Sequence, residues 1–427
     1  MALPVAWYPR RKALQWRLLA RGWRPILAAA RLHRATLSRR RHVVLVTGCY
    51  GKTTTTRALR AIFGLRADGW AELNTNCLGE VGWTVLREAP WRPIAVEAGI
   101  GTPGKMRVYA RAVRPDTTIV TGVGREHLRA FGSMEAVREE KAEAVRALSA
   151  DAVAILNADD AGARWMATQT AARVRWFGLD PSSPVSARDV ALDWPHGTRL
   201  TLVVDGRAVP LRTRLIGRHF VYPLLAAVSA GLAAGIRLDA MLPALERLPP
   251  TPARLEPLRL ANGAYLLCDD YKGTPDTFAP ALAVLAALPA RRRLVVLGDL
   301  NNLPSYPAAP HYAEVGAAVA RVADEVLVVG GRLDAYGAGL RAAGFPSARL
   351  AHAADVAAAT AMLRRDLRDG DVALLKGCED QGLTRIALAL AGRAVRCPVD
   401  WCAVRLQACG DCPLLDVPLP LGAGAAP

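Results

Sequence analysis

Residues 42–60 read His-Val-Val-Leu-Val-Thr-Gly-Cys-Tyr-Gly-Lys-Thr-Thr-Thr-Thr-Arg-Ala-Leu-Arg, and this stretch predicts a strand, a tight loop and a helix in succession. The apolar, β-branched run at 43–46 is typical of a buried parallel strand. Gly48 and Gly51 allow a tight turn before a helix that opens on four threonines at 53–56. Unpaired N–H groups and the helix dipole then point at one spot, so this arrangement predicts an anion site.

The side chains of this loop are typical of a phosphate site for ATP. Lys52 brings a positive charge to the site, and Thr53 offers a hydroxyl to a magnesium ion. The loop is shorter than the general G-x-x-x-x-G-K-S/T form, because position 46 is a valine. A glycine turn that occurs by chance would not explain why a strand, a loop, a Lys-Thr pair and a helix follow one another in the order of a phosphate loop. We therefore predict that ATP phosphates are bound by Gly48, Gly51, Lys52, Thr53 and Thr54.

The composition excludes a disordered chain and argues against a nucleic-acid-binding protein. The 427 residues are enough for two or three domains, and 52% of them are hydrophobic. The net charge is +17, but residues 1–41 hold ten Arg, one Lys and no acid, so this segment alone carries +11. The basic character therefore belongs mainly to one terminal segment rather than to the body of the protein.

Residues 1–41 form a basic amphipathic segment, which predicts one or two helices broken near Pro25. The basic side of the helical wheel has Arg10, Arg17, Arg21, Arg24 and Arg31, and the apolar side has Trp16, Leu19, Trp23, Ile26, Leu27 and Ala30. Such a helix suits a membrane surface or a partner. The pattern also fits a helix docked on the protein's own core with its arginines in solvent. With no apolar run of signal or membrane-spanning length, we expect a cytoplasmic protein, with peripheral contact to the inner membrane face as an open alternative.

Two α/β domains follow this segment. Residues 42–250 predict a phosphate-loop domain with a mostly parallel sheet, because helical stretches alternate with strand-like runs at 43–46, 94–97, 117–121, 152–156 and 174–177. A hairpin around Asp205 and Gly206 adds an antiparallel edge. Residues 251–395 predict a smaller Rossmann-like α/β domain, with strands at 264–268, 293–297, 325–329 and 372–375.

Residues 396–427 form a tail rich in cysteine and proline. Four thiolates could close a zinc or iron–sulfur site, and the tail offers Cys397, Cys402, Cys409 and Cys412. Only the last pair has the tight spacing typical of such sites. The alternative is that these are reduced cysteines that pack in a cytoplasmic protein.

Three more candidate site residues lie at or beyond strand ends. Glu97 ends the strand at 94–97, and a carboxylate there suits a magnesium ion on ATP. His127 follows the strand at 117–121, and Lys141 lies on an acidic helix. Taken singly, each of these residues has an ordinary structural interpretation.

Taken together, these motifs resemble the central domain of the Mur ligases. The matching segments are Gly48-Cys-Tyr-Gly-Lys-Thr-Thr-Thr, Glu97-Ala-Gly-Ile, Gly122-Val-Gly-Arg-Glu-His-Leu and Lys141-Ala-Glu. The resemblance continues at Asn157 and His219, and it reaches a C-terminal domain at Asp269-Asp-Tyr and Lys376-Gly-Cys-Glu. It extends over residues 42–392.

The resemblance implies an ATP-dependent ligase that joins a carboxylate donor to an amine acceptor. The carboxylate would attack the γ-phosphate to give an acyl phosphate and ADP, and the amine would then displace phosphate. The implied catalytic residues are Lys52, His127, Lys141 and Lys376. The implied Mg²⁺ ligands are Thr53, Glu97, His127 and a carbamylated Lys141.

Other positions are implied to contact the nucleotide. Asn157 and His219 match residues near the adenine, and Arg254 and Asp270 match residues that reach ATP when the domains close. Closure would exclude the water that hydrolyses an acyl phosphate. Lys376 would meet the substrate or the phosphates from the second domain.

The sequence departs from the family in several respects. Phe220 and Pro223 stand where the family has asparagines, so a catalytically weak nucleotide-binding scaffold at the membrane surface is the alternative function. Only about 41 residues precede the loop, too few for the UDP-sugar-binding domain of peptidoglycan Mur ligases. A UDP-muramoyl peptide is therefore not the expected substrate, and related ligases without that domain act on folates, polyamide chains or lipid-linked wall precursors.

Overall fold

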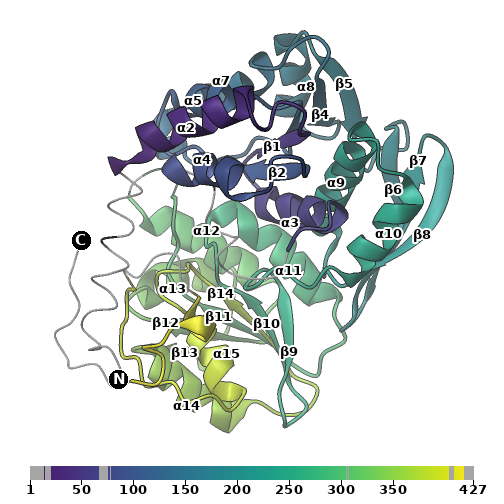
Figure 1. The fold of residues 1–427 in the computed structure, drawn as a ribbon. Helices are drawn as coiled ribbons and strands as arrows, with labels where there is room; N and C mark the ends of the chain where they lie inside the picture. The colour runs from purple at the N-terminus through teal and green to yellow at the C-terminus, as the bar shows by residue number, and fades with distance from the viewer. Residues whose placement is uncertain are drawn as a thin grey trace. The chain divides into compact units, whose positions relative to one another are not determined.

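The computed structural model describes residues 14, 21–66, 76, 78–303, 305, 307–402 and 408–417. The chain separates into two compact units, one at Trp16–Pro249 and one that contains Pro250–Pro427. Both units combine a sheet with helices (Figure 1), so the predicted α/β class is confirmed.

The first unit is built on one eight-stranded sheet, in the order β2-β1-β3-β4-β5-β6-β7-β8. Its strands are β1 (Val43–Thr47), β2 (Ile94–Glu97), β3 (Thr117–Val120), β4 (Val153–Asn157), β5 (Arg173–Phe177), β6 (Val185–Asp193), β7 (Gly197–Val204) and β8 (Arg207–Thr213). The pairings from β2 to β6 are parallel, and the last two are antiparallel. Strands β1 to β4 are buried along their whole length, which explains their continuous apolar runs.

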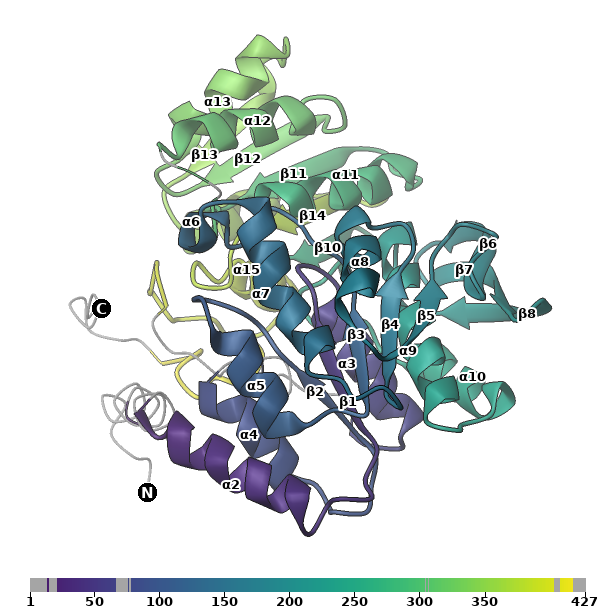
Figure 2. The same ribbon diagram turned by 90° about the horizontal axis from the view of Figure 1, so that it is seen from above.

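Helices cover both faces of this sheet (Figure 2). One face carries α3 (Lys52–Ile62), α9 (Val221–Ala233) and α10 (Leu238–Arg247), and the other carries α5 (Lys105–Val113) and α7 (Met134–Arg146). The other helices are α2 (Trp23–Ala35), α4 (Leu78–Arg87), α6 (Leu128–Phe131) and α8 (Ala161–Met166), with short turns η2 (Ala167–Gln169) and η3 (Arg218–Phe220). The sheet is therefore shielded on both sides, as a parallel sheet requires.

The described part of the basic N-terminal segment is mainly α2, which packs on α4 and α5. Leu27 and Ala30 are buried there, so the described part of the apolar face contacts the protein's own core. The helix begins at Trp23 and includes Pro25 in its first turn, where proline is tolerated. The break predicted near Pro25 lies at Gly22, between the helical residue Arg21 and the start of α2. Of the residues expected on the two faces, Arg10, Trp16, Arg17 and Leu19 lie outside the described residues.

The second unit has a six-stranded sheet in the order β13-β12-β11-β14-β10-β9. Its strands are β9 (Glu256–Arg259), β10 (Tyr265–Asp269), β11 (Arg293–Leu297), β12 (Glu325–Val329), β13 (Leu350–Ala353) and β14 (Val372–Lys376). Its helices are α11 (Phe278–Ala287), α12 (Ala309–Val319), α13 (Leu333–Ala342), α14 (Val356–Asp366) and α15 (Thr384–Leu390), with turns η4 (Pro275–Thr277), η5 (Ser347–Arg349) and η6 (Cys409–Asp411). Among these described strands, only the pairing of β9 with β10 is antiparallel.

The strand order of this second sheet makes it Rossmann-like. The chain runs outward from β11 to β13 and then returns to β14, which lies between β11 and β10. Ligands of such sheets bind at the carboxyl ends of the strands where the order reverses. Among the described residues, no helix is long and apolar enough to cross a bilayer.

Candidate functional site

The phosphate loop connects β1 to α3 and needs glycine at two positions. Gly48 has a φ of 141°, and a Cβ there would collide with the Oγ1 atom of Thr121. Gly51 has a left-handed backbone with a φ of 79° and directly precedes α3. Because this N-cap residue is a glycine, it has no side chain to occupy the first turn of the helix. The helix start is therefore suited to an anion.

Lys52 lies at the start of α3, next to this loop. The residue is 8% exposed, and its Nζ donates a 3.2 Å hydrogen bond to the carbonyl oxygen of Cys49. Thr53 is partly exposed, whereas Thr54 is buried. Thr53 is therefore the more exposed of these two threonines.

Glu97 is brought to the same edge of the sheet by strand register. In the parallel pairing of β1 and β2, Glu97 lies opposite Val46, one residue before the loop begins to leave the strand. Its Oε1 accepts a 2.9 Å hydrogen bond from the amide nitrogen of Asn76. Its Oε2 is buried and has no hydrogen-bond partner among the described residues. A buried carboxylate oxygen in this state favours a cation, and a hard oxygen ligand suits Mg²⁺.

Lys141 reaches the phosphate loop from α7. It is fully buried, and its Nζ donates a 2.8 Å hydrogen bond to the carbonyl oxygen of Gly48. Burial lowers the pKa of Lys141, and the charge of Lys52 lowers it further, while Cys49 and Glu126 act in the opposite direction. The neutral amine is therefore more populated here than in an exposed lysine.

His127 lies in the loop after β3, at the start of α6. Its backbone is left-handed, with a φ of 68°, which is uncommon for a residue with a side chain. Its Nε2 lies 3.3 Å from Oε1 of Glu126. The loop that carries His127 thus reaches the phosphate loop, because the other carboxylate oxygen of Glu126 lies 3.8 Å from Lys52 Nζ.

Asn157 lies at the end of β4, and His219 lies in the turn before α9. The Asn157 Nδ2 donates to the carbonyl oxygen of Thr121 at 3.0 Å, and its Oδ1 accepts from the Asp159 amide at 3.0 Å. The Asn157 amide therefore ties the ends of β3 and β4 together. His219 lies in η3, directly before α9, with its ring 4.3 Å from that of Phe220.

The start of α9 also touches the phosphate loop. A Cβ on Gly51 would lie 3.1 Å from Cγ of Pro223, which is in the first turn of α9. Pro223 therefore lies against the phosphate loop, where it offers no amide to a ligand.

Lys376 forms a buried ion pair in the second unit. It ends β14, is fully buried, and has its Nζ 2.8 Å from Oδ2 of Asp269 at the end of β10. It also donates a 2.8 Å hydrogen bond to the carbonyl oxygen of Lys272. Burial lowers the pKa of Lys376, and Asp269 opposes this shift.

Asp270 has one bonded and one unbonded oxygen. Its Oδ2 accepts a 2.8 Å hydrogen bond from the hydroxyl of Thr384, while Oδ1 is buried without a hydrogen-bond partner among the described residues. Burial raises the pKa of Asp270 to about 6. Beside it in the chain is Tyr271, whose ring centre lies 4.4 Å from the guanidinium of Arg254. The carboxyl ends of β10 and β14 thus carry the candidate residues of this unit.

The described tail cysteines give no support to a zinc or iron–sulfur site, which is one of the two interpretations of their spacing. The described residues, which include Cys397, Cys402, Cys409 and Cys412, contain no group of three or more potential ligands able to hold a metal. Burial raises the pKa of Cys409 to about 12, which disfavours the thiolate that a metal needs. The tail backbone is instead held by Arg385, which donates to the Cys397 carbonyl oxygen at 2.9 Å.

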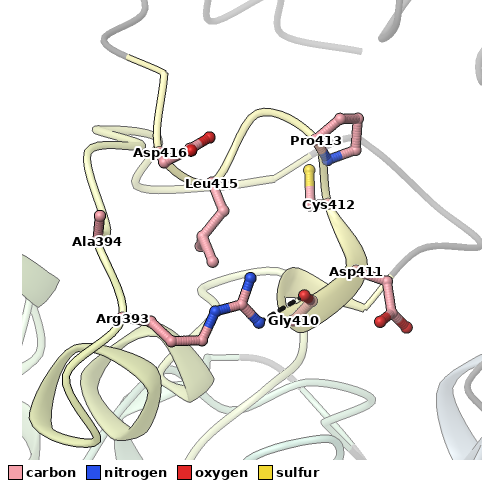
Figure 3. A pocket seen from close by; sticks show the side chains of 8 residues that line it. All are labelled: Arg393, Ala394, Gly410, Asp411, Cys412, Pro413, Leu415 and Asp416. Carbon is pink, nitrogen blue, oxygen red and sulfur yellow. Dashed lines mark hydrogen bonds between the residues drawn. The ribbon is translucent and has the colours of Figure 1, made fainter.

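A cavity of about 430 Å³ lies between this tail and the residues just before it (Figure 3). Its lining residues are Arg393, Ala394, Gly410, Asp411, Cys412, Pro413, Leu415 and Asp416. The Arg393 guanidinium donates a 2.7 Å hydrogen bond to the carbonyl oxygen of Gly410. Of the candidate site residues, Cys412 alone lines this cavity.

Comparison with known families identifies the family of this chain. The Mur ligase middle domain matches residues 46–231, and the Mur ligase glutamate ligase domain matches residues 253–378. The UDP-N-acetylmuramoyl-tripeptide–D-alanyl-D-alanine ligase of Mycobacterium tuberculosis (strain CDC 1551 / Oshkosh) is 31% identical over 370 residues, which cover 82% of this chain and 72% of that protein. The chain belongs to the Mur ligase family.

Other Mur ligases support the same assignment. The enzyme of the same name from Escherichia coli (strain K12) is 30% identical over 292 residues, or 67% of this chain and 64% of that protein. In fold, this Mur ligase is similar to crystal structure II of MurF from Acinetobacter baumannii, with a TM-score of 0.76, 22% identity, and coverage of 86% and 80% of the two chains. MurF from Thermotoga maritima in complex with ADP gives a TM-score of 0.72 at 20% identity, with coverage of 86% and 83%.

The family assignment confirms the predicted activity class. This Mur ligase is an ATP-dependent ligase that forms amide bonds, and the alternative of a weakly active scaffold is not supported. Sequence reasoning gave no role to Glu126, although it lies within the Gly122-to-Leu128 motif. Its neighbour His127 was assigned the role instead, and the burial of Glu126 and its contacts with Lys52 and His127 become visible only in the structure.

Proposed function

We propose that this Mur ligase activates a substrate carboxylate at the phosphate loop and passes the acyl group to an amine. The proposal rests mainly on the hydrogen bond between Lys141 Nζ and the Gly48 carbonyl oxygen, which joins the candidate lysine of α7 to the phosphate loop. A carboxylate oxygen attacks the γ-phosphorus, and the bond to the β-phosphate oxygen breaks to release ADP. The amine nitrogen then attacks the acyl carbon, the bond to phosphate breaks, and the nitrogen loses a proton.

The protein's own groups stabilise the charges of these steps. Lys52 neutralises the phosphates, and the helix start of α3 adds N–H donors. Thr53, Glu97, His127 and a carbamylated Lys141 would hold Mg²⁺, and the unbonded Oε2 of Glu97 fits that assignment. When bound, the ion neutralises charge on the β- and γ-phosphates.

Carbamylation of Lys141 would change a cation into an oxygen ligand. The neutral amine adds to CO₂, a C–N bond forms, and one proton is lost to give the carbamate. The lowered pKa of Lys141 favours this reaction, because the attacking species is the neutral amine. A carbamate at this position would also reverse the local charge and favour a divalent cation.

In the second unit we assign substrate or nucleotide contacts to Arg254, Asp270 and Lys376. The unbonded, buried Oδ1 of Asp270 supports a ligand contact there. Asn157 and His219 are assigned to the nucleoside side, with Asn157 acting through the strand ends that it ties together. The donor is a carboxylate and the acceptor is an amine. We place the reaction in the cytoplasm, where ATP is available.

An assay of ADP release tests the proposed reaction. The full-length chain is incubated with ATP, Mg²⁺ and pairs of acids and amines, including folates, polyamide chains and lipid-linked wall precursors. We expect ADP only when an acid and an amine are both present, because the acyl phosphate turns over only when the amine accepts the acyl group. Omission of either substrate is the control. ADP release that does not depend on the acid or the amine would contradict a ligase.

Contact with an anionic membrane surface is a further proposal for the basic N-terminal segment. Leu32 and Leu37 are 65% and 74% exposed, and Arg24 and Arg31 are also exposed. Exposed arginines and leucines together suit an anionic bilayer surface. We expect the chain to sediment with phosphatidylglycerol vesicles and not with phosphatidylcholine vesicles. Equal recovery in the supernatant with both lipids would exclude this contact.

A further inference from the structure

One buried carboxylate at the phosphate loop belongs to Glu126. It lies in the loop between β3 and α6 and is 4% exposed. Its Oε2 lies 3.8 Å from Lys52 Nζ, and its Oε1 lies 3.3 Å from Nε2 of His127. A single carboxylate therefore contacts two candidate site residues that come from different segments of the chain.

The surroundings of Lys52 indicate what this carboxylate does. The Lys52 side chain is 9% exposed, and a buried ammonium group needs a counter-charge. Its Nζ donates to the uncharged carbonyl of Cys49 at 3.2 Å. In the part of the chain that the structure describes, Glu126 is the acid paired with this lysine.

A bound nucleotide would need the same charge. The β- and γ-phosphates of ATP place negative oxygens beside the lysine of a phosphate loop. The Glu126 carboxylate and the phosphate oxygens are both negative, and in a buried environment they repel strongly because little solvent screens them. Glu126 and the phosphates therefore compete for Lys52.

We propose that Glu126 is the resident counter-ion of Lys52 and weakens nucleotide binding until the phosphates replace it. This inference rests on the proposed ATP site and adds a positioning residue to it. Glu126 acts on the nucleotide through Lys52. Once ADP is formed, the same carboxylate competes again for the lysine and favours release of the product.

Titration calorimetry of the full-length chain tests this with Glu126→Gln, which keeps the shape of the side chain and removes its charge. We expect E126Q to bind ATP and ADP about tenfold more tightly than the wild type, the size of effect that one close charge pair produces. The tighter binding of E126Q should be present both in Mg²⁺ and in EDTA, because the competition between Glu126 and the phosphates for Lys52 does not involve the metal.

Two further variants separate this role from a structural one. Glu143→Gln makes the same change on α7, where Glu143 pairs with Arg107 and Arg146, and it should leave ATP affinity unchanged. In a Lys52→Gln background, E126Q should no longer tighten ATP binding, as followed by ligand-observed NMR at high ATP. An effect that acts through packing alone would persist without Lys52.

The outcomes are distinguishable. Unchanged or weaker ATP binding by E126Q in EDTA overturns the counter-ion proposal. Weaker binding confined to Mg²⁺ would make Glu126 a metal ligand and would also overturn it. A wild-type chain that binds no ATP at all would remove the proposed ligase function, which is a separate failure.

Discussion

Lys52→Gln is expected to abolish ATP-dependent turnover. The substitution removes a buried positive charge from the start of α3, where Lys52 is 8% exposed and faces the phosphate loop. Loss of one charge-stabilising donor typically costs about 100-fold to 1,000-fold in rate. We expect ADP release in the presence of acid and amine to fall by at least about 100-fold. The ATP affinity measured by calorimetry should fall as well.

A matched control exists in the same unit. Lys105→Gln removes the same charge from α5, where the Lys105 Nζ lies 4.2 Å from the centre of the Trp23 ring. It should leave ATP binding and turnover unchanged. Thermal melts of both variants show whether the fold is retained, because K52Q leaves Glu126 buried without its cation. Full activity in a folded K52Q protein would disprove the assignment of the phosphate loop.

Lys141→Arg is expected to remove both the carbamate and turnover. Arginine keeps the charge but cannot form the carbamate, so it cannot supply the oxygen ligand. We expect a loss of at least roughly 100-fold, because changing even a residue that only supports a metal ligand costs up to about this factor. Lys105→Arg is the control, because it makes the same lysine-to-arginine change at a residue outside the proposed site.

The carbamate itself can be observed by ¹³C NMR after exchange with labelled bicarbonate. The signal should rise with pH through the pKa of Lys141, because the neutral amine is the reacting form. Burial lowers that pKa, so the rise should occur at a lower pH than for an exposed lysine. A wild-type protein with no carbamate signal across this range, or a fully active K141R, would refute the modification.

The loop and the sheets could be predicted because their signals are local. The apolar run at 43–46 is fully buried as β1, and Gly48 and Gly51 adopt backbone conformations that favour glycine. The hairpin of β7 and β8 turns at Asp205 and Gly206, where two residues contain the whole turn signal. Glu97 and Lys376 lie at strand ends, and this too could be predicted because the apolar runs that indicate their strands are local.

Contacts between distant segments could not be predicted in this way. The spacing of the tail cysteines says only that four thiols could meet. In the structure the Cys402 amide donates to the Asp380 carbonyl oxygen at 2.6 Å, and Arg385 holds the Cys397 carbonyl. These contacts fix the tail backbone, and the described residues contain no group of three or more potential ligands able to hold a metal.

The N-terminal segment is a second case. Its amphipathic pattern allowed either a membrane or the protein's own core as its docking surface. The burial of Leu27 and Ala30 shows that the described part of its apolar face packs on the core. A pattern on a helical wheel identifies an apolar face, but only the packing of α2 on α4 and α5 identifies what covers that face.

The sequence by itself therefore determined the type of each main element and the chemistry of the phosphate loop. Only the tertiary structure decided which charges meet, as in the approach of Glu126 to Lys52 and the bond from Lys141 to the Gly48 carbonyl. The physical reason is that turns and buried strands depend on neighbouring residues, whereas an ion pair depends on how parallel strands align and where the loops after them pack. Glu126 and Lys52 follow two adjacent strands, β3 and β1, and the pairing of those strands brings their loops together.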